Sequence, residues 1–494
     1  MGTEFQAIKK TNKRNIELQR KDSQEICQSE TSKKEKPGRQ QKERPKKIAD
    51  ADLLKITVEH FFGDKLNKWI DEIKDPRVKD QCTYELKHLF WLGLLMFILR
   101  LGSRRQLTSE KETDSFKCNL LSLSGTDEEK VAHSDTMNYL MERVKPEEVE
   151  KVKIKMIKQL IINKRIDQFR ISGEFRIAID GSGLYSFSQK HCEQCLKTEH
   201  SNGKVTWSHK MLEAKIVAEN GFAFSICSES IENPDGFYKK QDCELKAFYR
   251  LVKRLKLYFP RAQFCLLLDS LYACKEVFKI CKQQNWNFII AFKEGSIPTL
   301  YAEAVRKKVI FDKNSLNVKI DKNLTQNLSW VHHLAYEGFS LNAIFCKDIN
   351  LQKNKETNWL WLTNCKPDID NVYELANKGG RQRWKIENQG FKDQKRHGFE
   401  LEHPYGYAPN AWKNYYQLLQ IAHILTQLIT HGDLCQKLQA VHTDNKKDKT
   451  LPFLKYYQSI RNFVRRLTES FRNFSFSDAC DILIGKIQIR FSSA

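Results

Sequence analysis

The spacing of apolar residues along the chain changes near residue 174. Before this point, residues 53–70, 84–101 and 149–164 carry apolar side chains at three- and four-residue intervals, which predicts amphipathic helices. After it, short apolar runs of strand length alternate with further helical patterns. This change predicts an all-helical N-terminal domain over residues 51–170, followed by an α/β domain.

Strand and helix patterns follow one another in a definite order after residue 174. Strands are predicted at residues 175–180, 211–218, 222–229, 264–269 and 286–292, and helices at residues 241–258 and 272–284. Asn220 and Gly221, between the second and third strands, favour a tight β-hairpin. The order strand, hairpin, helix, strand, helix, strand predicts an RNase H-like core, a mixed sheet flanked by helices on both faces.

The remaining segments divide this core and surround it. Its first part spans residues 171–299, and alternating patterns over residues 300–375 predict a β-rich insertion. The core resumes over residues 376–430 with a helix, and a helical region follows over residues 431–494. Residues 1–50 are poor in aromatic residues and rich in Lys, Gln and Glu, which predicts a basic flexible arm. Such an arm is either a plain tail or a non-specific phosphate-binding segment.

Composition adds a strong positive charge. The 494 residues include 83 Lys and Arg against 61 Asp and Glu, which gives a formal net charge of +22. This excess favours a polyanionic partner, above all nucleic acid. The most apolar stretch, residues 89–99, is too short to span a bilayer, so no membrane association is expected. Fourteen Cys without a disulfide-like framework, and no visible secretory signal peptide, predict a cytoplasmic protein.

Three acidic residues stand in settings that suggest chemistry. Asp180 and Asp269 each end an apolar strand pattern, and Glu387 lies within a helical pattern. In an RNase H-like sheet the first and fourth strands are neighbours, so we expect the two Asp to lie close together, with a later helix adding Glu387. Carboxylate oxygens are the ligands that Mg²⁺ prefers, and two such ions can clamp the attacking and leaving oxygens of a phosphodiester. Taken singly, each residue has another explanation. Asp180 and Asp269 could each cap a following turn or helix, and Glu387 could be a solvated helix residue.

The sequence around these acids is more specific than their placement. The stretches are Ala-Ile-Asp180-Gly-Ser-Gly, Leu-Leu-Leu-Asp269-Ser-Leu-Tyr-Ala and Arg383-Trp-Lys-Ile-Glu387-Asn-Gln-Gly-Phe-Lys392, with Lys-Gln-Asp-Cys-Glu244 between the first two. Together they resemble the DDE transposases of bacterial insertion sequences, in the cut-and-paste group with a β-strand insertion. The resemblance extends from about residue 80 to about residue 430.

The resemblance implies a transposase that cleaves DNA at transposon ends and transfers the freed 3′-OH to target DNA. It also implies that the helical domain over residues 51–170 binds the DNA ends. It implies two Mg²⁺ ions, with Mn²⁺ as an alternative, held by Asp180, Asp269 and Glu387. The implied partners are double-stranded DNA, as terminal inverted repeats and as target, and a second copy of the chain in a homodimer on DNA. The protein would then be associated with the bacterial nucleoid. The alternatives are a metal-dependent nuclease without strand transfer and a domesticated, inactive DNA-binding relative.

The third motif departs from the pattern of that group, which is Tyr, two residues, Arg, three residues, Glu, six residues, Lys. The Tyr position is Gly380 and the Lys position is Gln394. On a regular helix these positions share one face, so Gln394 is expected where a cation would meet a phosphate. Lys392 or Lys395 would then substitute as DNA-binding residues.

Two further DNA-binding candidates are Arg383 and Trp330. Arg383 lies one turn before Glu387, so it is expected to orient that carboxylate or hold a phosphate, the alternative being a plain intrahelical ion pair. The resemblance suggests that Trp330, in the insertion, stacks on an unpaired base, whereas its strand pattern favours a place in the β core. Trp359 and Trp361 are expected in the core.

A cluster of Cys and His follows the first predicted strand. Cys192 and Cys195 have a spacing typical of zinc sites, and His200 supplies a third ligand within ten residues. His191 adjoins Cys192, and His209 is a more distant alternative to it. The sequence therefore permits a structural Zn²⁺ site, the alternative being a solvated loop with two free thiols.

Overall fold

Helices follow one another from Asp52 to Ile162, as the apolar spacing predicts. The computed structural model describes residues 49–233, 238, 241–442, 450–477, 484 and 486–491, so nearly all of the predicted basic arm lies outside the described residues. The helices are α2 (Asp52–Phe61), α3 (Lys65–Asp71), α4 (Leu86–Ile98), α5 (Arg104–Glu110), α6 (Asp114–Ser124), α7 (Ser134–Arg143) and α8 (Pro146–Ile162), with 3₁₀ turns at Lys79–Gln81 and Asp167–Phe169.

Local sequence explains where several of these helices begin. Pro146 is the first residue of α8 and two Glu follow it in the first turn, which suits the missing N–H of proline and the helix dipole. The side chains of Ser103 and Thr113 cap α5 and α6 by accepting from the backbone N–H groups of Gln106 and Phe116. The apolar stretch in α4 is buried from His88 to Ile98, so it forms part of the core.

The elements from residue 175 to 291 follow the predicted order. They are β1 (Phe175–Phe187), β2 (Leu196–Glu199), β3 (Val205–Val217), β4 (Ala223–Ile231), α9 (Glu244–Tyr258), β5 (Phe264–Leu268), α10 (Lys275–Gln284) and β6 (Asn287–Ala291). Gly221 turns the β3–β4 hairpin with φ +99°, a conformation that glycine adopts without strain. The structure adds β2, which the sequence did not predict, and extends β1 seven residues beyond Asp180.

The predicted β-rich insertion is also present, and it continues the same sheet. Helix α11 (Pro298–Ile310) is followed by the antiparallel strands β7 (Ser315–Lys319), β8 (Leu324–Tyr336), β9 (Phe339–Asn350) and β10 (Lys355–Thr363). Strand β10 pairs antiparallel with β6, with Trp361 opposite Ala291. The strand order is therefore β2-β3-β1-β5-β6-β10-β9-β8-β7, with β4 paired to β3.

An irregular helix follows the insertion and bears Glu387. It begins with α12 (Val372–Glu374), continues through the π-helical turn η5 (Leu375–Gly379), the 3₁₀ turn η6 (Gly380–Arg383) and the π-helical turn η7 (Ile386–Phe391), and ends with α13 (Lys392–Arg396). The chain then forms α14 (Pro409–His431), α15 (Leu434–His442), α16 (Phe453–Tyr457) and α17 (Ile460–Asn473).

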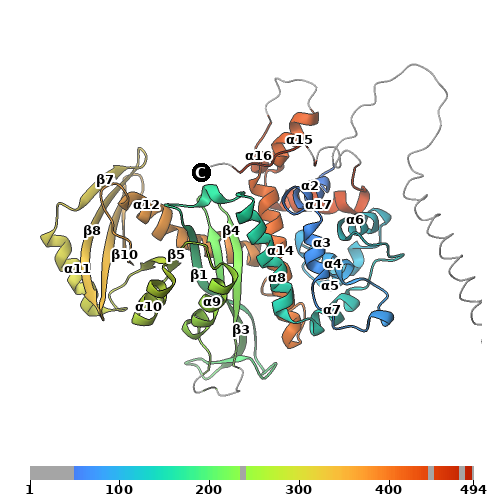
Figure 1. Ribbon diagram of the computed structural model, residues 1–494, viewed down its shortest axis with the longest axis horizontal. Coiled ribbons are helices and arrows are strands. Elements are labelled where there is room, and N and C mark those ends of the chain that lie inside the picture. The colour runs from blue at the N-terminus through green and yellow to red at the C-terminus, as the bar shows by residue number, and fades with distance from the viewer. Residues whose placement is uncertain are drawn as a thin grey trace, which may run out of the picture. The chain divides into compact units, whose positions relative to one another are not determined.

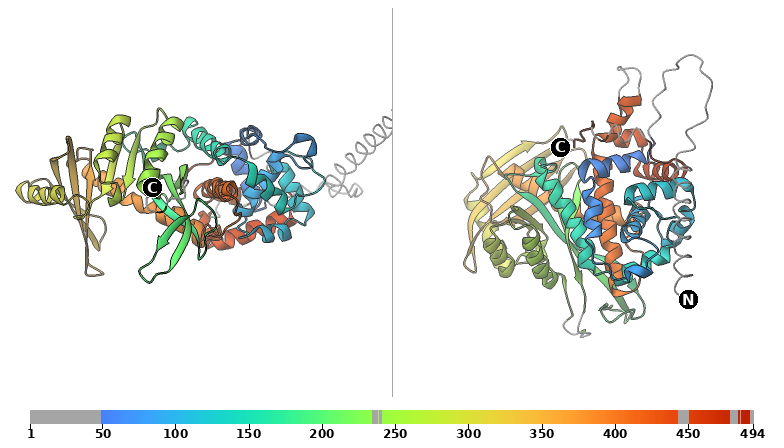
Figure 2. Two further views of the ribbon diagram at one scale, coloured as in Figure 1. Left: turned by 90° about the horizontal axis from the view of Figure 1, so that it is seen from below. Right: turned by 45° about the vertical axis from the view of Figure 1, so that its right-hand side comes forward.

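Helices cover both faces of the central strands (Figures 1 and 2). Helices α9 and α10 lie on one face, whereas η6, η7, α8 and α14 pack on the other. Helix α14 also packs against α2, α4, α7 and α8, so the N-terminal helices and the sheet share one core. The fold is thus a mixed α/β structure with a large mixed sheet. No helix within the described part of the chain is long and apolar enough to cross a membrane.

Candidate active site

Strand pairing brings Asp180 and Asp269 together. Strands β1 and β5 are parallel neighbours, as expected, with Ala178 opposite Leu267. Each Asp lies two residues further along the chain, just beyond the last paired residues, so the two carboxylates lie side by side where the pairing of β1 with β5 ends. Asp269 also accepts a hydrogen bond from the backbone N–H of Leu271 at 2.9 Å, so it caps the following turn as well. Asp269 therefore caps a turn, as one interpretation expected, and the same carboxylate can also take part in a metal or catalytic site.

A fourth acidic residue, Glu244, joins this pair. It begins α9, and its Oε1 accepts from the backbone N–H of Gly181 and from the hydroxyl of Tyr272, both at 3.1 Å. A Cβ at Gly181 would lie 2.8 Å from the Glu244 carboxylate, so only glycine permits this approach. The sequence predicted no site role for Glu244, although its signal was present in the stretch around it that belongs to the resemblance.

Arg383 faces Asp180 rather than Glu387. Its Nη1 lies 3.1 Å from Oδ2 of Asp180, and both side chains are largely buried. Burial raises the pKa of Asp180 to about 6, although Arg383 lowers it, and the charges of Glu244 and Asp269 raise it further. Burial also raises the pKa of Glu244, and the charge of Asp269 adds to that shift. The acids at this sheet edge therefore repel one another, and Arg383 offsets part of the repulsion.

Glu387 is exposed and lies on η7, which packs on β1. It borders an open hollow lined by charged side chains and one amide, namely Glu387, Asn388, Lys392, Lys395, Arg396 and Glu402. Among the described residues, the group of His, Cys, Asp and Glu side chains that lie close enough together to hold a metal ion includes none of Asp180, Asp269 and Glu387. The structure thus brings the two Asp together and leaves Glu387 at the rim.

The predicted placement of Gln394 is wrong. Gln394 is fully buried, and its amide exchanges hydrogen bonds with that of Gln420 at 2.9 and 3.2 Å. Lys215, also buried, donates to the same Gln420 side chain at 2.7 Å. The error arises because π-helical and 3₁₀ turns replace regular α-helix before Gln394, so positions that would share one face of an α-helix do not do so here.

Gly380, at the other departure from the motif, is required by packing. A Cβ at Gly380 would lie 2.4 Å from the ring of Trp361, and one at Gly379 would lie 2.4 Å from Cδ1 of Ile289. The pair of glycines lets the irregular helix approach the sheet closely. No Tyr side chain fits at Gly380 while the ring of Trp361 occupies this space.

The remaining DNA-binding candidates divide into exposed and buried residues. Lys392 is exposed, and Lys395 forms an ion pair with Glu402 at 3.0 Å. Trp330 is only 6% exposed, which confirms its place in the core and removes it as a ring presented to a base. Trp384 was missed by the sequence analysis: it is 46% exposed, with the guanidinium of Arg383 4.6 Å from its ring centroid.

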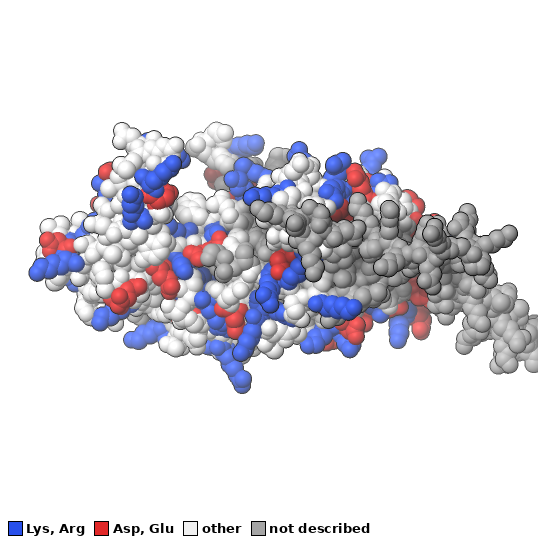
Figure 3. Space-filling model, turned by 90° about the horizontal axis from the view of Figure 1, so that it is seen from above, with Lys and Arg blue, Asp and Glu red and all other residues white. Residues whose placement is uncertain are grey.

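Surface charge does not single out one track on the face drawn in Figure 3. Lys and Arg are spread over this face with Asp and Glu between them, rather than gathered into one stripe. The basic side chains around Glu387 are therefore the more informative feature.

Comparison with known proteins gives no family for this chain. The sequence matches no protein-family model. A search among curated proteins likewise finds no match. The chemistry of the site therefore rests on its own residues.

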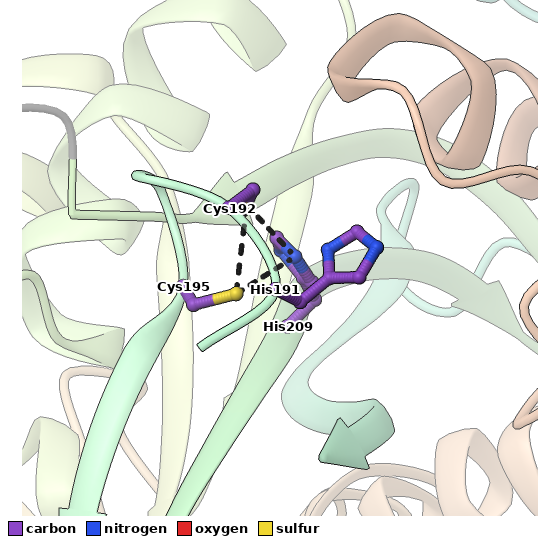
Figure 4. A group of neighbouring side chains, drawn as sticks. All are labelled: His191, Cys192, Cys195 and His209. Carbon is purple, nitrogen blue, oxygen red and sulfur yellow. Dashed lines mark hydrogen bonds between the residues drawn. The ribbon is translucent and has the colours of Figure 1, made fainter. Parts of the chain in front are cut away.

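A second cluster gathers around His191, Cys192, Cys195 and His209, whose ligand atoms all lie within 4.8 Å of one another (Figure 4). His200 was predicted in this cluster and is not part of it, because it lies at the tip of the β2–β3 hairpin. There its Nε2 is 2.9 Å from Oγ1 of Thr206. His209 and His191 take its place.

Proposed function

We propose that this chain is a DDE transposase that cleaves DNA at transposon ends and joins the freed 3′-OH to target DNA. The observation that carries the proposal is the meeting of Asp180 and Asp269 where the parallel strands β1 and β5 diverge, with Arg383 against Asp180 and Glu387 on the adjacent helix. The order and directions of β4, β3, β1, β5 and β6 support an RNase H-like core.

The acidic residues suit a divalent cation with oxygen ligands. The charge of Asp269 raises the pKa of both Asp180 and Glu244, and the charge of Glu244 adds to the shift of Asp180. A cation would relieve the same repulsion. Asp180, Asp269 and Glu387 would hold Mg²⁺, or Mn²⁺ in its place. When bound, such ions supply activation of a water nucleophile and stabilisation of the charge on the leaving oxygen.

Arg383 would hold the Asp180 carboxylate in position before DNA arrives. Its planar set of N–H donors is equally suited to a phosphate. If a metal ion neutralised Asp180, Arg383 would be free to bind a phosphate of the scissile strand instead. Glu244 would act as a positioning residue, because it ties the backbone of Gly181 and the Tyr272 hydroxyl to the start of α9.

DNA would approach along the hollow beside Glu387. Lys392, Lys395 and Arg396 supply positive charge for phosphates there, and the exposed ring of Trp384 offers a platform for an unpaired base. The proposal entails double-stranded DNA as partner, a homodimer on that DNA and a place in the bacterial cytoplasm with the nucleoid.

A nuclease without strand transfer is the second candidate. The burial of Trp330 and Gln394 favours it, since two of the expected contacts to a transposon end are missing.

A joining assay separates the two functions: the protein is incubated with Mg²⁺, a labelled duplex carrying one end of the flanking DNA, and a plasmid target. The transposase proposal predicts cleaved and joined products. Cleavage alone would favour the nuclease, and binding alone an inactive DNA-binding relative.

A further inference from the structure

Strand pairing explains how the His and Cys residues of the second cluster meet. Strands β2 and β3 are antiparallel, with Leu196 opposite Ser208. Cys195 immediately precedes Leu196 and His209 immediately follows Ser208, so the two stand across from each other at the open end of the hairpin. Cys192 joins them through a tight turn, in which the N–H of Cys195 donates to the carbonyl of Cys192 at 3.4 Å.

The distances within the cluster match those required by a tetrahedral ion. The two Sγ atoms are 3.5 Å apart, and Nε2 of His209 lies 3.4 Å from each of them. Zn–S bonds of about 2.3 Å and Zn–N bonds of about 2.0–2.1 Å place ligand atoms roughly 3.8 Å apart for two sulfurs and roughly 3.6 Å for sulfur and nitrogen. The triangle formed by these three atoms is therefore close to one face of such a tetrahedron.

His191 supplies the fourth corner. Its ring stacks on Phe187, with centroids 4.8 Å apart and planes at 15°, and it also lies 5.1 Å from the ring of Tyr407. Its Nδ1 is buried and has no hydrogen-bond partner among the described residues. A buried nitrogen without a partner is costly unless something binds it, and a metal ion would do so.

We propose that His191, Cys192, Cys195 and His209 bind one structural Zn²⁺ ion. Two thiolates and two imidazoles are a donor set that zinc favours, and four protein ligands leave no open position for catalysis. Cys195 and His209 are fully buried, so the ion would be shielded from solvent on the side of the sheet.

The zinc would fasten the loop between β1 and β2, which holds His191, Cys192 and Cys195, to strand β3 through His209. The cluster also contacts the start of α14, since the ring of His209 lies 4.7 Å from that of Trp412. His209 pairs with Tyr185, five residues beyond Asp180 on β1. At about 3.4 Å per residue, this places the ion roughly 17 Å from the candidate active site. The proposal is thus independent of the transposase function.

Metal content of the full-length protein tests the proposal directly. The chain is purified without chelators or affinity metals, and zinc and protein are quantified by elemental mass spectrometry. We expect about one zinc per chain. A folded protein with almost no zinc would overturn the proposal. So would a disulfide between Cys192 and Cys195, detected as two thiols missing from the unreduced protein.

Variants identify the ligands. Cys195→Ser and His209→Ala should lose the zinc, whereas the matched control His200→Ala should retain it, because His200 lies at the far end of the hairpin. Loss of zinc in His200→Ala with retention in His209→Ala would overturn the assignment. Because buried variants can fail to fold, the half-exposed Cys192→Ser is measured as well. Co²⁺-loaded wild-type protein should show the visible absorption of a tetrahedral thiolate site, and its absence would also contradict the proposal.

Discussion

The guanidinium of Arg383 lies 3.1 Å from the carboxylate of Asp180, although the two residues are 203 positions apart in the chain. The sequence also allowed an ion pair between Arg383 and Glu387 within one helix. This pair does not form among the described residues, because the 3₁₀ turn directs Arg383 toward β1. Arg383 therefore offsets part of the repulsion between Asp180 and the acids beside it.

Replacing Asp180 should stabilise the metal-free protein above neutral pH. Its pKa of about 6 exceeds the ordinary 3.8, so folding favours the protonated form, and this contribution is lost as the pH rises through about 6. We expect Asp180→Asn to raise the unfolding free energy near pH 8 by on the order of 1–3 kcal/mol and to change it little near pH 4. Chemical denaturation at the two pH values measures this difference.

Asp80→Asn, which replaces an exposed carboxyl in the 3₁₀ turn Lys79–Gln81, serves as the control for that experiment. Mg²⁺ should raise the melting temperature of the wild type more than that of Asp180→Asn. A destabilised Asp180→Asn at pH 8 would mean that loss of the Arg383 ion pair outweighs the relief of repulsion.

Arg383→Gln should shift the pH dependence of cleavage. Arg383 lowers the pKa of Asp180, so its removal raises that pKa and moves the acidic limb of the rate profile to higher pH. The cleavage rate near neutral pH should fall about 10–100-fold, as when a residue supporting a metal ligand is lost. Arg396→Gln, in the hollow but not against Asp180, should weaken DNA binding and leave the acidic limb in place. An unshifted limb in Arg383→Gln would contradict the assigned role.

Glu244→Gln tests the fourth acid. The variant keeps the shape of the side chain but removes its charge, so we expect a roughly 10–100-fold loss of cleavage or of Mg²⁺ affinity. The matched control is Glu276→Gln, since Glu276 is exposed in the first turn of α10. Equal activity of the two variants would remove Glu244 from the site.

Replacing Trp384 should affect DNA binding, whereas replacing Trp330 should affect stability. Trp384→Ala removes an exposed ring and should weaken binding to DNA with an unpaired base by about 1–3 kcal/mol, with little change in stability. Trp330→Ala should instead cost about 3–5 kcal/mol of stability, because its ring is buried. Binding titrations and denaturant unfolding on both variants separate the roles. Normal DNA affinity of Trp384→Ala would exclude Trp384 as a stacking residue.

The sequence predicted the central strands because apolar runs and hairpin signals are local, and the strand order expected of an RNase H-like core then predicted that Asp180 and Asp269 lie side by side. It failed where distant segments decide the outcome. Gln394 is buried because the helix before it is irregular, and nothing in its local spacing signals a π-helical turn. His209 meets Cys195 through a hairpin whose first strand, β2, has only four residues. The insertion joins the main sheet through the pairing of β10 with β6, which residue patterns do not specify.

The most direct test of the central claim is the Mg²⁺-dependent joining assay on the wild type and on Asp180→Asn, Asp269→Asn and Glu387→Gln. The account predicts cleaved and joined DNA with the wild type, and neither product with any of the three variants, while each still binds the duplex. Cleavage retained by any one variant, or no joining by the wild type on its own flanking ends, would contradict it.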